Sequence, residues 1–224
     1  MRLVSDKYGV NLLLSPGTAQ VLCVENPGAL TDIVRGAWIQ SQGDEGDLLL
    51  SEADKEINWE KEVEVISNPF SVDCNSKKIL TKLYKKMQEI LNEELYEEKT
   101  AVNAQIVQLL DMLSGKMQYA CEYELDMDTL GLLKIYNMRI QSVQETPEDT
   151  LIDYLRAMYQ ICHVKLFIFF NSRSYYDQRK LQQIYEFVQY EKINILFIEN
   201  HADNWLEGEK VWILDKDLCT IEVN

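Results

Sequence analysis

The 224-residue sequence is poor in basic residues. It contains 22 Lys and Arg against 37 Asp and Glu, which gives a formal net charge of −15 and a pI near 4.6. This excess of negative charge excludes a protein that coats nucleic acid phosphates over its whole surface. It leaves room for a local basic patch, because net charge is a sum over the surface.

The sequence also lacks metal-binding thiol pairs. Its five cysteines are scattered and odd in number, none has C-x-x-C spacing, and there are only two histidines. This pattern argues against a structural zinc site. No signal peptide follows Met1, and the longest apolar run, Val164–Phe170, contains Lys165 and is too short to span a bilayer. We therefore expect a soluble cytoplasmic protein with free thiols and no membrane partner.

Motifs for nucleotide hydrolysis and for nucleophilic catalysis are missing too. Glu25–Ala29 stands where an α/β nucleotide-binding protein places its phosphate loop, but it matches neither G-x-x-x-x-G-K-[ST] nor G-x-G-x-x-G. No G-x-S-x-G elbow accompanies His163 or His201, which we expect to be packing or surface residues.

What is present at both ends of the chain is an alternation of apolar runs and helical patterns. Val10–Leu14 and Ala19–Val24 flank a turn-rich spacer and predict a hairpin. Asn26-Pro27 and Thr146-Pro147 are N-cap signals for helices. Further strands are predicted at 48–50, 62–66, 166–170, 193–198, 211–214 and 220–223, with a helix at 178–190. The β-α-β order of apolar strands predicts an α/β fold with a parallel sheet covered on both faces.

The middle of the chain has a different texture. Between Asn75 and Met117 there is no proline, and apolar residues recur at helical spacing, so we expect two long amphipathic helices or one kinked near Thr100. The organisation predicted is an α/β head of residues 1–74 and 141–224, interrupted by a helical leg of residues 75–140 that ends in an acidic segment.

Two groups of charged residues in the leg are candidate sites. The cations precede the anions along the first helix, which opposes the preference of the helix dipole. The ordinary interpretation of this run is a solvated helix face, and a phosphate-binding face is the less favoured alternative. The acids alternate, so in an extended segment they would project to one side, where they suit a hard cation such as calcium or magnesium, or form a solvated acidic edge. The candidate phosphate-binding residues are Lys77, Lys78, Lys82, Lys85 and Lys86. The candidate metal ligands are Glu122, Glu124, Asp126 and Asp128.

The order of these segments resembles the Csn2 family, the accessory adaptation proteins of subtype II-A CRISPR loci. Asp73-Cys74-Asn75-Ser76 is similar to the family's D-x-N-S helix cap, and Glu124-Leu125-Asp126 to its acidic E-L-D segment. Lys165–Ser172 resembles its K-L-L-I-F-x-N-S strand. Ile195–Glu199 and Trp212–Asp215 resemble its last strands.

The resemblance implies an α/β head shaped like an ATPase core without nucleotide hydrolysis, and a helical leg. It also implies a homotetrameric ring, stabilised by calcium, that admits double-stranded DNA ends through a basic hole. Such a protein supports spacer acquisition beside the integrase proteins and the RNA-guided effector nuclease of its locus. Glu124 and Asp126 match the acidic motif directly. For DNA binding, the five lysines at 77–86 are the first candidates, and Arg2, Arg35, Arg173 and Arg179 rank below them. The stretch after Asp126 is shorter than in the family, so a ligand that relatives supply there can be missing or replaced.

Two other function classes remain open from the residues alone. One is a metal-dependent nuclease using the carboxylates at 122–128 with magnesium, although no lysine or histidine for proton transfer lies next to them in sequence. The other is a protein scaffold that never contacts DNA, as the net charge suggests. Our expectation from the resemblance is a DNA-binding protein that is not an enzyme.

Overall fold

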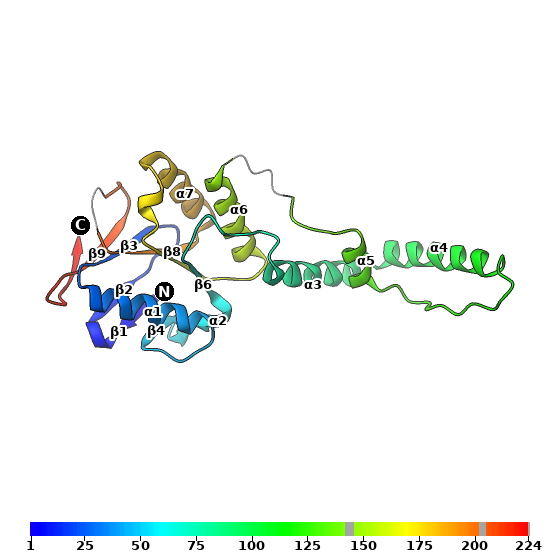
Figure 1. Cartoon of the computed structure of the whole chain (residues 1–224), viewed down its shortest axis with the longest axis horizontal. Helices are drawn as coiled ribbons and strands as arrows, with labels where there is room; N and C mark the ends of the chain where they lie inside the picture. Colours follow the sequence, from blue (N-terminus) through cyan, green and yellow to red (C-terminus); the bar gives the residue numbers. More distant parts are fainter. Residues whose placement is uncertain (142–145, 202–204, 224) are drawn as a thin grey trace. The chain divides into compact units, whose positions relative to one another are not determined.

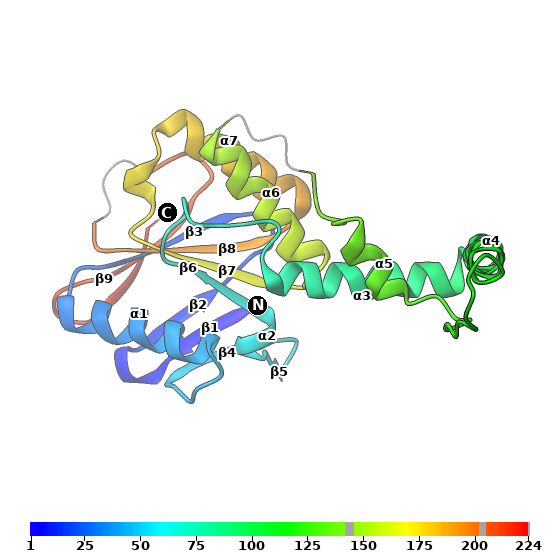
Figure 2. The ribbon, with the colours of Figure 1, turned by 45° about the vertical axis from the view of Figure 1, so that its right-hand side comes forward.

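The computed structural model describes residues 1–141, 146–201 and 205–223. The chain forms two compact units, one of Met1–Cys74 with Ser142–Asn224 and the other of Asn75–Gln141. The sequence predicted boundaries after residues 74 and 140. The first coincides with this division, and the second lies one residue before it. Each unit is described by itself below (Figures 1 and 2).

The first unit contains a six-stranded sheet in the order β10-β9-β3-β8-β7-β6. The five strands from β9 to β6 are parallel, and β10 pairs antiparallel with β9 at one edge. All residues of β3 and β8 are buried, as expected for central strands with both faces covered. The predicted α/β class with a parallel sheet is confirmed. The strands are β3 (Ala19–Val24), β6 (Val63–Ile66), β7 (Leu166–Phe170), β8 (Asn194–Glu199), β9 (Lys210–Leu214) and β10 (Thr220–Val223).

A second, antiparallel sheet was not foreseen. Its order is β2-β1-β4-β5, and with α1 it covers one face of the larger sheet, whereas α6 and α7 cover the other (Figure 2). Leu3, Leu12 and Leu50 from this small sheet pack in one core with Val24 and Leu196 of the larger one. The elements are β1 (Arg2–Ser5), β2 (Val10–Leu13), β4 (Leu48–Glu52), β5 (Lys55–Glu56), α1 (Pro27–Ser41), α2 (Trp59–Glu62), α6 (Pro147–Gln160) and α7 (Gln178–Glu191), with short 3-10 turns at Asp6–Tyr8 and Arg173–Tyr175.

The predicted hairpin of Val10–Leu14 and Ala19–Val24 is wrong. The strand β2 pairs with β1, whereas β3 lies in the other sheet between β8 and β9. The burial patterns give the physical reason. Alternate residues of β2 are exposed, so it covers one face only, while β3 is buried throughout and belongs at the centre of the parallel sheet.

The predicted helix starts are confirmed. The Asn26 side chain accepts hydrogen bonds from the backbone N–H groups of Gly28 (3.0 Å) and Ala29 (3.1 Å), and that of Thr146 accepts one from Asp149 (3.2 Å). Each proline then occupies a first-turn position that needs no donor. Across the described ranges, no helix is long and apolar enough to cross a membrane.

The second unit consists of α3 (Lys77–Glu93), α4 (Tyr96–Ser114) and α5 (Thr129–Ile135), joined by irregular segments. Of the two arrangements expected, two separate helices form, with the break at residues 94–95 and not at Thr100. The ends of this insertion are tied together, because Asn75 donates to the Ile140 carbonyl (3.1 Å) and accepts from the Ile140 N–H (2.9 Å). The insertion therefore begins and ends at one point.

Candidate nucleic-acid interface

The five candidate lysines all lie on α3, and all are exposed. At about 100° per residue, four of them fall within an arc roughly 100° wide, and Lys77 lies outside it at the first turn. Ile79, which is fully buried, and the partly buried Leu83 and Met87 form the adjoining face, whose centre lies roughly 110° around the helix from that of the four lysines. We call Lys78, Lys82, Lys85 and Lys86 the basic face of α3.

The lysines of this face are exposed to solvent, which limits how far a neighbouring acid can neutralise them. Lys85 lies 3.8 Å from Glu89, but both side chains are more than half exposed, so the pair contributes little. The lysines occupy the N-terminal half of α3, where the helix dipole adds to their positive potential. Ser76, the residue before the helix, makes no side-chain capping bond. The face therefore places four exposed lysines close together in a strongly acidic chain.

The four candidate metal ligands lie after α4 in a segment without regular structure. Glu122, Glu124 and Asp126 are exposed and, among the described residues, join no ion pair. The expected extended run that would align them on one side does not form. Among the residues described, no three His, Cys, Asp or Glu side chains come close enough to hold a metal ion. Within the described part of the chain, these acidic side chains thus do not converge on a common point.

Asp128 has a different place from the other three acids. It caps α5, because its carboxylate accepts the Gly131 backbone N–H at 2.9 Å. A Cβ on residue 131 would lie 2.3 Å from that carboxylate, so glycine allows the close approach. The sequence Asp128-Thr129-Leu130-Gly131 could have indicated this cap. The cap therefore engages one of the two carboxylate oxygens of Asp128.

The segment 122–128, which carries the four candidate metal ligands, is held against the helices of its own unit. The Asn103 side chain on α4 donates to the Leu125 carbonyl at 2.8 Å, and Tyr123 donates to the Asp111 carboxylate. Gln88 on α3 donates to Thr129 at 3.2 Å. These contacts fix the backbone on both sides of Glu124 while leaving its carboxylate in solvent.

The apolar stripe predicted for α4 is present but is largely uncovered. Within the described residues, α4 contains no buried side chain. An amphipathic helix is normally stabilised by burial of its apolar face, so an uncovered face of this length indicates an interaction surface. The apolar face of α4 consists of Val102 (46% exposed), Ile106 (39%), Leu109 (56%) and Leu113 (55%).

The segment at the phosphate-loop position has a structural role. Asn26 caps α1 with its side-chain oxygen and donates its amide N–H to the Lys216 carbonyl at 3.2 Å. Glu25 beside it is exposed. Both histidines are exposed, which confirms the surface interpretation for His163 and His201.

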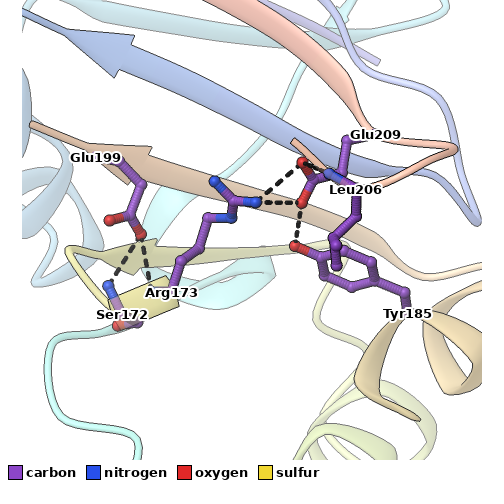
Figure 3. A network of polar contacts seen from close by, with 6 residues as sticks. All are labelled: Ser172, Arg173, Tyr185, Glu199, Leu206 and Glu209. Carbon is purple, nitrogen blue, oxygen red and sulfur yellow. Dashed lines mark hydrogen bonds and ion pairs between the residues drawn. The ribbon is translucent and has the colours of Figure 1, made fainter. Parts of the chain in front are cut away.

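Arg173 was ranked among the additional DNA-contacting residues, but it is buried and is not available for phosphate contact at the surface. Its side chain is only 8% exposed, and its Nη2 donates to both carboxylate oxygens of Glu209 (Figure 3). Glu209 and the nearby buried Glu199 escaped the sequence reasoning. Glu199 could have been found, because it ends an otherwise apolar predicted strand, where a carboxylate is out of place.

The fold and the site together define an α/β protein with a parallel sheet, without a phosphate loop, and with an inserted helical unit that bears a basic face. The family model for CRISPR-associated protein (Cas_Csn2) matches residues 40–218. The chain therefore belongs to the CRISPR-associated Csn2 family.

Two individual likenesses accompany this match. The chain is 23% identical over 179 residues to CRISPR-associated protein Csn2 of Enterococcus faecalis, covering 77% of this chain and 78% of the relative. It is also similar to the solved structure of the dimeric, post-hydrolysis state of the ATP-binding cassette MJ0796 bound to ADP and Pi. That likeness has a TM-score of 0.42 and 12% identity, and it covers 96% of this chain and 90% of the other.

Proposed function

We propose that this protein binds double-stranded DNA ends without sequence preference, through the hole of a homotetrameric ring. It supports spacer acquisition in the cytoplasm as a non-enzymatic partner of the integrase proteins and the RNA-guided effector nuclease of its locus. The observation that carries the proposal is the basic face of α3. Lysine contacts to phosphate give affinity without reading the bases, so such binding is independent of sequence.

Self-association is supported by the apolar face of α4. Four aliphatic side chains along this helix are 39–56% exposed in the single chain. A second copy of the chain offers the same surface, and a shared surface of this kind is what a two-fold symmetric interface requires. Two dimers formed through this interface, joined by a second and different interface, would give the proposed tetramer.

Calcium is proposed as a structural ion at Glu124 and Asp126, with Glu122 and Asp128 as lesser candidates. Calcium takes six to eight oxygen ligands, and carboxylates in solvent are suitable ones. Because a single chain gathers no three such side chains among its described residues, the remaining ligands would be carbonyl groups, water or groups of another subunit. In that case the ion would bind only on assembly and would stabilise the ring through mass action.

The direct test compares linear and covalently closed circular duplexes of one sequence. A ring that admits ends binds the linear form, and its affinity falls steeply as salt rises. Equal binding of both forms would contradict end binding, and binding of neither form would favour the scaffold alternative. Incubation of the linear duplex with magnesium or manganese tests the nuclease alternative, since cleavage that disappears in Asp126→Ala would contradict a non-enzymatic role.

A further inference from the structure

A cavity of about 680 Å³ lies in the α/β unit at the carboxyl ends of β7 and β8. Its size is within the range of roughly 300–1,000 Å³ typical of small-molecule sites. In open α/β sheets, ligands bind outside the carboxyl ends of the strands. Arg173, Tyr176, Glu199 and Trp205 contribute polar and aromatic groups to its wall. Among the described residues, none of the candidate lysines or metal ligands lines it, so it is a separate site.

The guanidinium of Arg173 is held in place by a buried carboxylate. The side chain of Glu209 is fully buried and accepts from Arg173 Nη2 (2.7 and 3.0 Å), from the Tyr185 hydroxyl (2.6 Å) and from the Leu206 N–H (3.0 Å) (Figure 3). Burial, with Glu209 next to it, raises the pKa of Tyr185, so the hydroxyl remains a donor. Arg173 therefore has a fixed position before any ligand arrives.

Two residues that line the cavity each carry a buried donor without an internal partner. Among the described residues, neither Arg173 Nε nor the Tyr176 hydroxyl has a hydrogen-bond partner, although both atoms are buried. The residues are 8% and 6% exposed. Buried donors are nearly always satisfied in folded proteins, so two orphans in one cavity wall indicate an absent acceptor.

Glu199 supplies an acceptor in the same wall. Its Oε1 accepts the backbone N–H groups of Ser172 (2.9 Å) and Arg173 (3.1 Å), and the residue is 5% exposed. These two bonds orient the carboxyl group, and Figure 3 shows its second oxygen turned away from them. Within the described ranges, that oxygen accepts no hydrogen bond from the protein. Burial raises the pKa of this carboxyl group, which is a sign of its desolvation.

The charge balance of the cavity disfavours a phosphate. Glu209 neutralises Arg173, and Glu199 adds a further carboxyl group, so the wall has no net positive charge. The site instead pairs an acceptor with donors beside an indole, Trp205, whose ring faces the Arg173 guanidinium at 5.4 Å. A flat heterocycle with donors and acceptors along one edge meets these requirements. Guanine has N1–H and N2–H₂ donors next to the O6 acceptor, and arginine pairs well with O6.

We propose that this cavity binds an unpaired guanine base, with Glu199 accepting from its N1–H and N2–H₂ edge and Arg173 and Tyr176 donating to its acceptors. The base can come from a free guanosine or from an unpaired nucleotide at a DNA end. The cavity alone supports this site, which does not require the basic face of α3.

The test is calorimetric titration of the full-length protein with guanosine, inosine, which lacks the 2-amino group, and cytidine. We expect guanosine to bind at least tenfold tighter than cytidine, which corresponds to about 1.4 kcal/mol, with inosine between them because it retains only one of the two donors. Glu199→Gln keeps an acceptor for the two backbone N–H groups but presents a donor to the base, so it should weaken guanosine binding at least tenfold. Glu207→Gln is the matched control, because Glu207 is exposed and does not line the cavity.

Tyr176→Phe separates binding from folding. Removing a buried hydroxyl without a partner should leave the protein as stable as before and still weaken guanosine binding several-fold. Duplexes with a one-nucleotide guanine or cytosine overhang distinguish the two sources of the base. Binding of guanosine alone indicates the free nucleoside, and a preference for the guanine overhang that Glu199→Gln abolishes indicates the DNA end. Absence of both, or equal affinity for all the nucleosides, would overturn the proposal.

Discussion

Nη2 of Arg173 donates to both carboxylate oxygens of Glu209, at 2.7 and 3.0 Å, and this pair lies inside the α/β unit. It joins the turn after β7 to the segment that precedes β9, which are 36 residues apart. Breaking a buried pair by removing one partner leaves an uncompensated charge and costs about 3–5 kcal/mol. Glu209→Ala should therefore lower the free energy of unfolding by about that amount in denaturant titrations. Glu207→Ala, at an exposed position nearby, should change it by no more than about 0.5 kcal/mol. Equal effects of the two changes would mean that the pair does not stabilise the unit.

Glu199 should make the stability of the protein depend on pH. Burial, aided by the charge of Glu209, raises the pKa of Glu199 above the ordinary 4.5. The backbone N–H groups of Arg173 and Ser172 and the charge of Arg173 oppose this shift only in part. A carboxyl group with a raised folded-state pKa stabilises the fold while it is protonated, and this contribution is lost as pH rises through that pKa. Glu199→Gln cannot ionise, so its stability relative to the wild type should rise across this window. Denaturant unfolding from about pH 4 to about pH 8 measures the difference, and a constant difference across this range would contradict the prediction.

The apolar face of α4 should be the surface of self-association in solution. Leu109 is 56% exposed in the single chain, so Leu109→Glu should cost little in folding of the chain but should bury a charge in any interface. Native mass spectrometry should show a smaller assembly for this variant. Ile135→Glu, on α5 at 81% exposure, should leave the assembly unchanged. Loss of the assembly in both variants, or in neither, would contradict the assignment to α4.

Calcium removal should loosen the assembly and weaken DNA-end binding together. Excess chelator, or Glu124→Gln combined with Asp126→Asn, should lower both the native mass and the affinity for linear duplex. Glu93→Gln with Glu94→Gln removes the same charge from exposed positions of this unit and should do neither. Unchanged mass and affinity in chelator would exclude a structural calcium ion.

The sequence predicted those parts of the fold that local signals determine. The capped starts of α1 and α6 and the buried strands β7 and β8 follow from N-cap chemistry and from apolar runs. The partner of each strand depends on long-range pairing, which explains the wrong hairpin between Val10–Leu14 and Ala19–Val24. The strand β1 at Arg2–Ser5 is too short and too polar to be recognised without its neighbours β2 and β4.

In the candidate site, too, the features set by local sequence were predictable, and those set by long-range contacts were not. Helical spacing predicted the helix that carries the five candidate lysines, and the structure places four of them on one face. The acids at 122–128 were expected to align, but contacts of Asn103 and Tyr123 with their own unit hold the segment in an irregular conformation. The network of Arg173, Glu199 and Glu209 joins residues far apart in sequence, and no local pattern could predict their pairing.

The central claim is that the basic face of α3 binds DNA ends, and one comparison of equilibrium affinities tests it most directly. Lys82→Gln, Lys85→Gln and Lys86→Gln together remove three charges from this face, while Lys55→Gln, Lys61→Gln and Lys216→Gln remove three from exposed positions of the α/β unit. For a blunt linear duplex titrated over a range of salt, the first variant should bind at least tenfold more weakly. Its log–log salt slope should be shallower by about 0.9 for each lysine–phosphate pair removed, while the second variant should bind like the wild type. Equal loss of affinity in the two variants, or an unchanged slope in the first, would contradict DNA-end binding by this face.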